Sequence, residues 1–147
     1  MKTIKEARQM LDEKKISSVE LTEEYLKKIK ANNEKLGAYI TVCEEDALNM
    51  AKKADEKIAS GEISSLTGIP MAIKDNICTM GIKTTCGSKM LESYIPPYNA
   101  TVMEKLNAEG IVTLGKTSMD EFAMGSSSEK SYFGTVRNPI DKTRAAG

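Results

Sequence analysis

A nine-residue stretch, residues 68–76, constrains the fold of this chain more than any other part of the sequence. It opens on a Gly-x-Pro break, continues through three apolar residues at 71–73, and ends abruptly in a lysine, an acid and an amide. Three apolar residues bounded by turn signals are too few for a helix, so they predict a buried strand. Such a strand would place Lys74 at its carboxyl end.

A lysine at the end of a half-buried strand has two interpretations. Partial burial disfavours the charged form of the side chain, and a neutral amine can act as a base. Alternatively, the stem lies along apolar neighbours and the ammonium group extends to water. Short patterns of this kind often match by chance, so the nine residues alone favour the second interpretation of Lys74.

The composition predicts one ordinary globular domain without a strongly charged surface. The 147 residues are 40% hydrophobic and carry 21 basic and 21 acidic side chains. This balance offers no basic surface for nucleic acid, so a nucleic-acid partner would have to be held by another subunit. The chain contains no histidine. Any base within it must therefore be Lys, Asp, Glu or Tyr, and a histidine metal site is excluded.

The cysteines and the hydropathy pattern predict a cytoplasmic protein. Cys43, Cys78 and Cys86 are an odd number and lack the CxxC spacing of a metal site, which is typical of reduced residues. The sequence has neither a signal peptide nor a run of about 18 apolar residues. We therefore expect neither secretion nor association with a membrane.

Residues 1–62 are expected to be mainly helical. Thr3 with Glu6, and Ser17 with Glu20, have the spacing of capping boxes, and each pair precedes an apolar stripe with a helical period. Each pair therefore predicts the start of a helix.

A short strand and a third helix are expected to follow in the same region. The strand covers residues 38–42, and the helix covers about residues 44–60 and ends at Gly61. None of these segments carries a pattern of residues that indicates a catalytic or binding site.

Residues 63–147 predict an α/β portion. After the strand at 71–73, Thr101 with Glu104 has the spacing of a helix cap, and a second apolar run follows at residues 111–114. A strand, a helix and a strand at this spacing predict layers of helix and sheet with partly parallel pairing.

Residues 110–117 match the letter pattern of a phosphate-binding loop. The residues between its two glycines, Ile-Val-Thr-Leu, are apolar or β-branched as in a strand. A phosphate-binding loop needs backbone amides exposed in an open turn. We therefore interpret the match as chance and predict a strand.

Residues 125–128, Gly-Ser-Ser-Ser, form a segment of small residues with two open interpretations. One is a flexible surface loop. The other is a wall at which backbone groups approach a ligand closely. Composition alone does not decide between them.

Taken together, several blocks of the sequence resemble the amidase signature family in order and spacing. They are GIPMAIKDN at 68–76, TTCGS at 84–88, GKT at 115–117, MDEFAMGSSSE at 119–129 and RNP at 137–139. The resemblance covers nearly the whole chain. It implies a mixed α/β sheet flanked by helices, present only in part, with residues 1–147 as the amino-terminal part of a single amidase domain.

The resemblance also implies roles for individual residues. Enzymes of this family hydrolyse amides with a serine nucleophile, a second serine in a cis peptide and a lysine, and they need no histidine. By this resemblance Lys74 is the catalytic base, and Met124, Gly125 and Ser126 belong to the substrate-binding segment. In the family both serines lie in a Gly-Ser-rich block that would follow Gly147. We therefore expect this chain alone to be inactive and assign no nucleophile within it.

Two segments, ISSVELTEEYLKKI and MDEFAMGSSSE, are more narrowly similar to the glutamine-hydrolysing subunits of tRNA-dependent amidotransferases. That similarity implies that ammonia passes to a B subunit, which activates Glu-tRNA(Gln) with ATP and Mg²⁺, while a small C subunit completes a heterotrimer. ATP, Mg²⁺ and tRNA would be ligands of the complex, and this chain would bind no cofactor. Two alternatives stay open: a stand-alone amidase of the family, and a non-catalytic fragment with a structural or assembly role.

Overall fold

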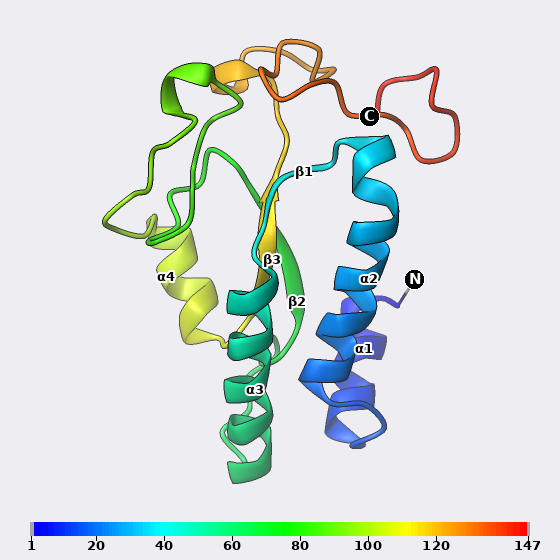
Figure 1. Cartoon of the computed structure of the whole chain (residues 1–147). Helices are drawn as coiled ribbons and strands as arrows, with labels where there is room; N and C mark the ends of the chain where they lie inside the picture. The colour runs from blue at the N-terminus through cyan, green and yellow to red at the C-terminus, as the bar shows by residue number, and fades with distance from the viewer. Residues whose placement is uncertain (1, 147) are drawn as a thin grey trace.

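The computed structural model of the protein describes residues 2–146 and contains a three-stranded mixed sheet with helices packed against it (Figure 1). Its elements, in chain order, are α1 (Ile4–Asp12), α2 (Ser18–Leu36), β1 (Tyr39–Val42), α3 (Glu44–Ser60), β2 (Pro70–Lys74), η1 (Lys89–Leu91), α4 (Thr101–Ala108), β3 (Val112–Thr117) and η2 (Glu121–Ala123), where η1 and η2 are single 3-10 turns. The predicted α/β class is confirmed.

The central strand of the sheet is β3. It pairs in parallel with β2 on one side and antiparallel with β1 on the other. Lys74 is opposite Thr117 in the parallel pair, so β2 and β3 end at the same edge of the sheet. The partly parallel pairing predicted from the sequence is confirmed, and so is the strand in place of a phosphate-binding loop.

Both predicted capping boxes form. The Thr3 hydroxyl accepts a hydrogen bond from the backbone of Glu6, whose carboxylate accepts one from the backbone of Thr3. Ser17 and Glu20 repeat the arrangement at the start of α2. Each box satisfies backbone donors that the first turn of a helix leaves free.

The start of α4 differs from its prediction. The residue that caps this helix is Ala100, which has no side-chain hydrogen bond to offer, and Thr101 is already the first helical residue. The backbone N–H of Ala100 donates to the Cys78 carbonyl at 2.9 Å. This tertiary contact fixes the chain at Ala100 and starts the helix there, so the predicted Thr101 cap is wrong.

Helices cover the two faces of the sheet and form its core (Figure 1). On one face α2 and α3 pack against β3 through a cluster of buried residues: Leu26, Ala47, Ala51, Val112 and Leu114. On the other face α4 packs through a second cluster: Ile73, Met103 and Ile111. A third cluster joins α1 and α2 to the start of β2: Ala7, Leu11, Leu21 and Ile69.

Strand β2 is less buried than the sequence predicts. Ile73 is buried against α4, but Ala72 and Lys74 are exposed. Within residues 2–146, β2 pairs only with β3 and lies at the edge of the sheet, so one side of the strand faces solvent. The prediction of a buried strand is therefore corrected to an edge strand with one buried side chain in its second half.

None of the helices in the described part of the chain combines the length and the apolar composition that a membrane span requires.

Candidate functional site

A cavity of about 280 Å³ opens at the shared end of β2 and β3. Lys74, the last residue of β2, lines it together with residues that follow β3: Ser118, Met119, Asp120, Ala123, Gly125, Ser126, Ser127, Ser128, Val136 and Ala146. Ligands of α/β proteins commonly bind outside the carboxyl ends of parallel strands. The structure therefore brings Lys74 together with Gly125 and Ser126, two of the three residues predicted to contact substrate.

A second cavity, of about 250 Å³, lies between α3 and the end of α4. Its lining is Met50, Lys53, Ala54, Lys57, Asn107, Gly110 and Ile111, which includes no residue of the predicted site. We therefore take the cavity at Lys74 as the candidate functional site.

The Lys74 side chain is exposed. Among residues 2–146, no hydrogen bond or ion pair holds its ammonium group. The half-buried environment expected for Lys74 is therefore wrong for this chain, because the outer side of β2 is open. Its role as a base stays a prediction.

Met124, the third residue of the predicted substrate segment, lies outside the lining of the cavity. Met124 is 72% exposed and directly follows η2, whereas Gly125 and Ser126 line the cavity together with Lys74. The predicted contact of Met124 with substrate also stays a prediction.

The serine-rich wall of the cavity is built around the buried carboxylate of Asp120. Its Oδ2 accepts hydrogen bonds from the backbone N–H groups of Ser127 at 3.1 Å and Ser128 at 2.8 Å, and its Oδ1 accepts one from Lys130 at 3.0 Å. A Cβ added to Gly125 would lie 2.6 Å from Asp120 Oδ2, so a larger residue there would displace the anchored carboxylate. The segment is an anchored wall, which favours the second interpretation of its composition.

The pKa of Asp120 is lowered, first of all by the hydrogen bonds from Lys130 and Ser128. A carboxyl group with a lowered pKa in the folded state stabilises the protein above its unfolded pKa of about 3.9, and this contribution is lost as the pH falls through the lower, folded value. Sequence analysis missed Asp120, although an acid a few residues before a Gly-Ser-Ser-Ser segment is a local signal for such an anchor.

We expect the substitution Asp120→Asn to lower the melting temperature by a few degrees at pH 7. The amide places an N–H₂ group where the backbone donors need an acceptor. The difference from the unsubstituted protein should begin to shrink below about pH 4, where the carboxyl group of the unfolded chain takes up its proton, and should vanish as the pH falls through the lowered pKa of the folded protein. Thermal unfolding from pH 7 to about pH 2 tests this, and a difference that stays constant over that range would contradict the account.

The buried lysine of this chain is Lys116, in the middle of the sheet. Its side chain is fully buried, and its Nζ donates to the Ile77 carbonyl at 2.8 Å and to Thr84 Oγ1 at 2.7 Å. Nζ also lies 3.7 Å from Oδ1 of the fully buried Asp75. Burial lowers the pKa of Lys116, and the Asp75 carboxylate opposes that shift. No local sequence signal marks this pair, because Lys116 is on β3 and Asp75 directly follows β2, far apart in the sequence.

Fold and cavity define the class of this protein: a mixed α/β protein whose candidate site lies at the carboxyl ends of parallel strands. Within that class the chain belongs to the amidase family, whose sequence profile matches residues 20–147.

Sequence identity to named proteins supports the membership in this family. The chain is 58% identical over 145 residues to the A subunit of the glutamyl-tRNA(Gln) amidotransferase of Thermoanaerobacter pseudethanolicus, a match that covers 99% of the chain and 30% of that protein. The chain thus spans about 30% of the length of the curated relatives that it matches.

Solved structures share the fold. The native peptide amidase of Stenotrophomonas maltophilia superposes with a TM-score of 0.87 at 29% identity, over 95% of this chain and 30% of that one. The A subunit of the glutamyl-tRNA(Gln) amidotransferase of Thermotoga maritima superposes with a TM-score of 0.76 at 35% identity, over 99% of this chain and 29% of that one.

Proposed function

We propose that this chain is the amino-terminal part of the glutamine-hydrolysing subunit of a tRNA-dependent amidotransferase. The observation that carries the proposal is the cavity that Lys74 lines together with the Gly125–Ser128 wall, in a chain 58% identical to an A subunit of a glutamyl-tRNA(Gln) amidotransferase. The rest of the subunit supplies the two serines of a Ser-cisSer-Lys triad. The complex works in the cytoplasm, in keeping with three free cysteines.

In this proposal Lys74 acts as the base. Its neutral amine takes a proton from the bridging serine, which in turn takes the proton of the nucleophilic serine. The serine oxygen attacks the side-chain carboxamide carbon of glutamine, the C–N bond breaks, and ammonia leaves with the transferred proton. Water then hydrolyses the acyl-serine ester and releases glutamate. Gly125 and Ser126 form the adjoining wall for the substrate.

The chain has no net charge, which supports the proposal that another subunit of the complex binds the tRNA. Ammonia passes to a B subunit, which binds Glu-tRNA(Gln), ATP and Mg²⁺ and forms the new amide, while a small C subunit completes the heterotrimer. This chain contributes no basic surface for tRNA and holds no cofactor of its own in this scheme.

A stand-alone amidase is the second candidate function, favoured by the structural likeness to a peptide amidase. A third is a fragment with only a structural or assembly role. Affinity purification of the full-length protein separates the first two. A tRNA-dependent amidotransferase subunit retains its B and C partners, whereas a stand-alone amidase is recovered without them.

We expect the full-length protein to release ammonia from glutamine and the 147-residue chain to release none. The reason is that the chain presents the base without the serine nucleophile. An ammonia assay on both proteins at equal concentration tests this. Turnover by the 147-residue chain that disappears in its Lys74→Ala variant would overturn the assignment of the nucleophile to the rest of the subunit.

A further inference from the structure

The buried pair of Lys116 and Asp75 binds a loop of the protein. Lys116 Nζ donates to Thr84 Oγ1 at 2.7 Å, and Asp75 Oδ2 accepts from the backbone N–H of Thr85 at 3.0 Å and from the Thr85 hydroxyl. Both threonine side chains are buried. Lys116 on β3 and Asp75, the residue directly after β2, thereby hold the loop of residues 84–88 from its buried side.

The other side of this loop contacts the segment that contains the cavity wall. The Cys86 carbonyl accepts a hydrogen bond from the N–H of Phe122 at 2.9 Å, and the Gly87 carbonyl accepts one from Tyr132 at 2.8 Å. Gly87 has a φ of +67°, and an added Cβ would lie 2.5 Å from the Met119 carbonyl oxygen. The loop therefore packs against residues 119–132 without space for a side chain at position 87.

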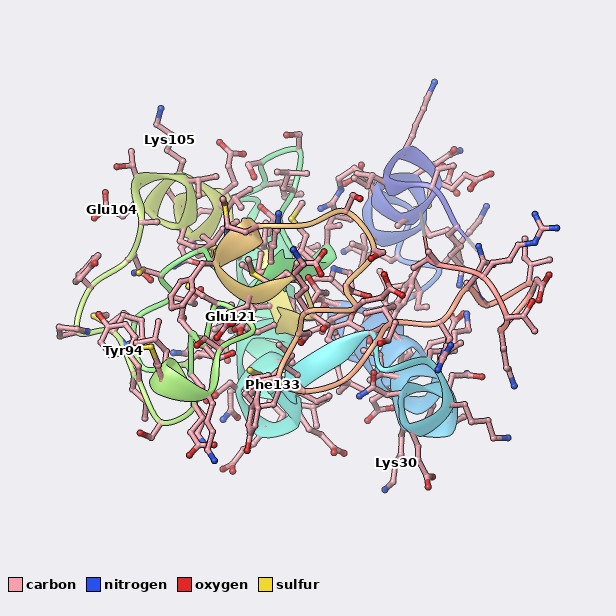
Figure 2. The ribbon with its side chains drawn as sticks, turned by 90° about the horizontal axis from the view of Figure 1, so that it is seen from above. Lys30, Tyr94, Glu104, Lys105, Glu121 and Phe133 are labelled. Atoms are coloured by element: carbon pink, nitrogen blue, oxygen red, sulfur yellow. The ribbon has the colours of Figure 1, made fainter. Side chains whose placement is uncertain are left out.

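The same segment lies over the end of the sheet. Seen from above, Glu121 on η2 lies near the middle of the molecule, close to the end of β3 (Figure 2). Its carboxylate accepts a hydrogen bond from the Ser88 hydroxyl at 2.5 Å. From the buried pair outward, contacts run through the 84–88 loop to the wall around Asp120.

We propose that Lys116 and Asp75 are positioning residues for the cavity at Lys74. They fix the 84–88 loop, and this loop fixes the wall that contains Gly125 and Ser126. Neither residue lines the cavity, so neither touches the substrate. For its catalytic consequence the inference rests on the proposed function, but its structural part, the restraint of residues 119–132, does not.

A purely stabilising role and a positioning role predict different kinetics. Loss of stability lowers the folded fraction and thus the apparent kcat, while the KM of the molecules that remain folded is unchanged. Loss of position moves the wall against which glutamine binds, so KM rises. A displacement of about 1 Å can cost up to about a hundredfold in rate.

The test uses the full-length protein with the double substitution Thr84→Val and Thr85→Val. These changes conserve shape and keep the Lys116–Asp75 pair. They remove the hydroxyl contacts to Lys116 and Asp75, together with the bonds that the same hydroxyls make to the Ile82 carbonyl and the Gly87 N–H. Thr113→Val is the matched control, because Thr113 is a fully buried threonine on β3 whose hydroxyl has no partner among residues 2–146. Thr84→Ser and Thr85→Ser restore the hydroxyl groups and serve as the rescue.

We expect backbone hydrogen exchange in residues 119–132 to become about tenfold faster in the valine double variant, and KM for glutamine to rise about tenfold with a smaller change in kcat. The Thr113→Val control and the serine variants should resemble the unsubstituted protein. If the double variant does not fold, the single variant Thr85→Val gives the same comparison. Unchanged exchange in residues 119–132 would overturn the inference.

Backbone hydrogen exchange tests the positioning role of Lys116 and Asp75, and the kinetics of glutamine hydrolysis test the proposed function. Faster exchange in a protein that does not hydrolyse glutamine would support the positioning role and overturn the proposed function. Unchanged exchange in a protein that does hydrolyse glutamine would overturn the positioning role alone.

Discussion

Replacing Lys74 by alanine in the full-length protein is expected to lower kcat for glutamine hydrolysis by about 10²–10⁴-fold, the contribution typical of a general base. The fold should survive, because the Lys74 side chain is exposed and makes no polar contact within residues 2–146. A substitution at such a position usually changes the free energy of unfolding by less than about 0.5 kcal/mol. Steady-state ammonia release and thermal unfolding measure the two effects.

Two control variants make this result specific. Lys74→Arg keeps the positive charge but cannot supply a neutral base, so it should be as inactive as Lys74→Ala. Lys83→Ala removes another exposed lysine outside the cavity lining and should keep full activity. A rate near that of the unsubstituted protein in Lys74→Ala would return Lys74 to the alternative interpretation, a lysine that merely extends to water.

Replacing Lys116 by methionine is expected to lower the free energy of unfolding by about 3–5 kcal/mol, because the buried Asp75 carboxylate then loses its partner. Methionine fills nearly the same space, so the cost arises from the unpaired charge and from the lost hydrogen bonds to Ile77 and Thr84. Chemical denaturation of the full-length protein measures it.

The double variant Lys116→Met with Asp75→Asn is the control for charge. It removes both charged groups and leaves an amide oxygen that can accept the hydrogen bond from Thr85, so a large part of the lost stability should return. A loss below about 0.5 kcal/mol in Lys116→Met alone would contradict a stabilising ion pair at this position.

The helical part of the fold was predictable because its signals are local. A capping box needs only Thr3 and Glu6, or Ser17 and Glu20, and both boxes form as predicted. The third helix, α3, has the predicted bounds, with Gly61 in the left-handed conformation at its end. Local signals fail where a distant contact decides the start of an element, as the Cys78 carbonyl does for α4.

The environments of the two lysines were not predictable from the sequence. Each follows a short apolar run, so the two patterns look alike, but Lys74 is on the edge strand and Lys116 is on the central one. The position of a strand in a sheet depends on pairing between distant segments. The Asp120 anchor differs, because an acid shortly before a Gly-Ser-Ser-Ser segment is a local signal for it; only the identity of its three backbone donors depends on how the loop closes.

The most direct test of the proposed function asks which serine is the nucleophile. The full-length protein is treated with a glutamine analogue that bears an electrophilic diazoketone, and the labelled peptide is located by mass spectrometry. We predict that the label lies on a serine outside residues 1–147 and that Lys74→Ala abolishes labelling. A label on Ser126, Ser127 or Ser128 would contradict the claim that this chain supplies the base while the rest of the subunit supplies the nucleophile.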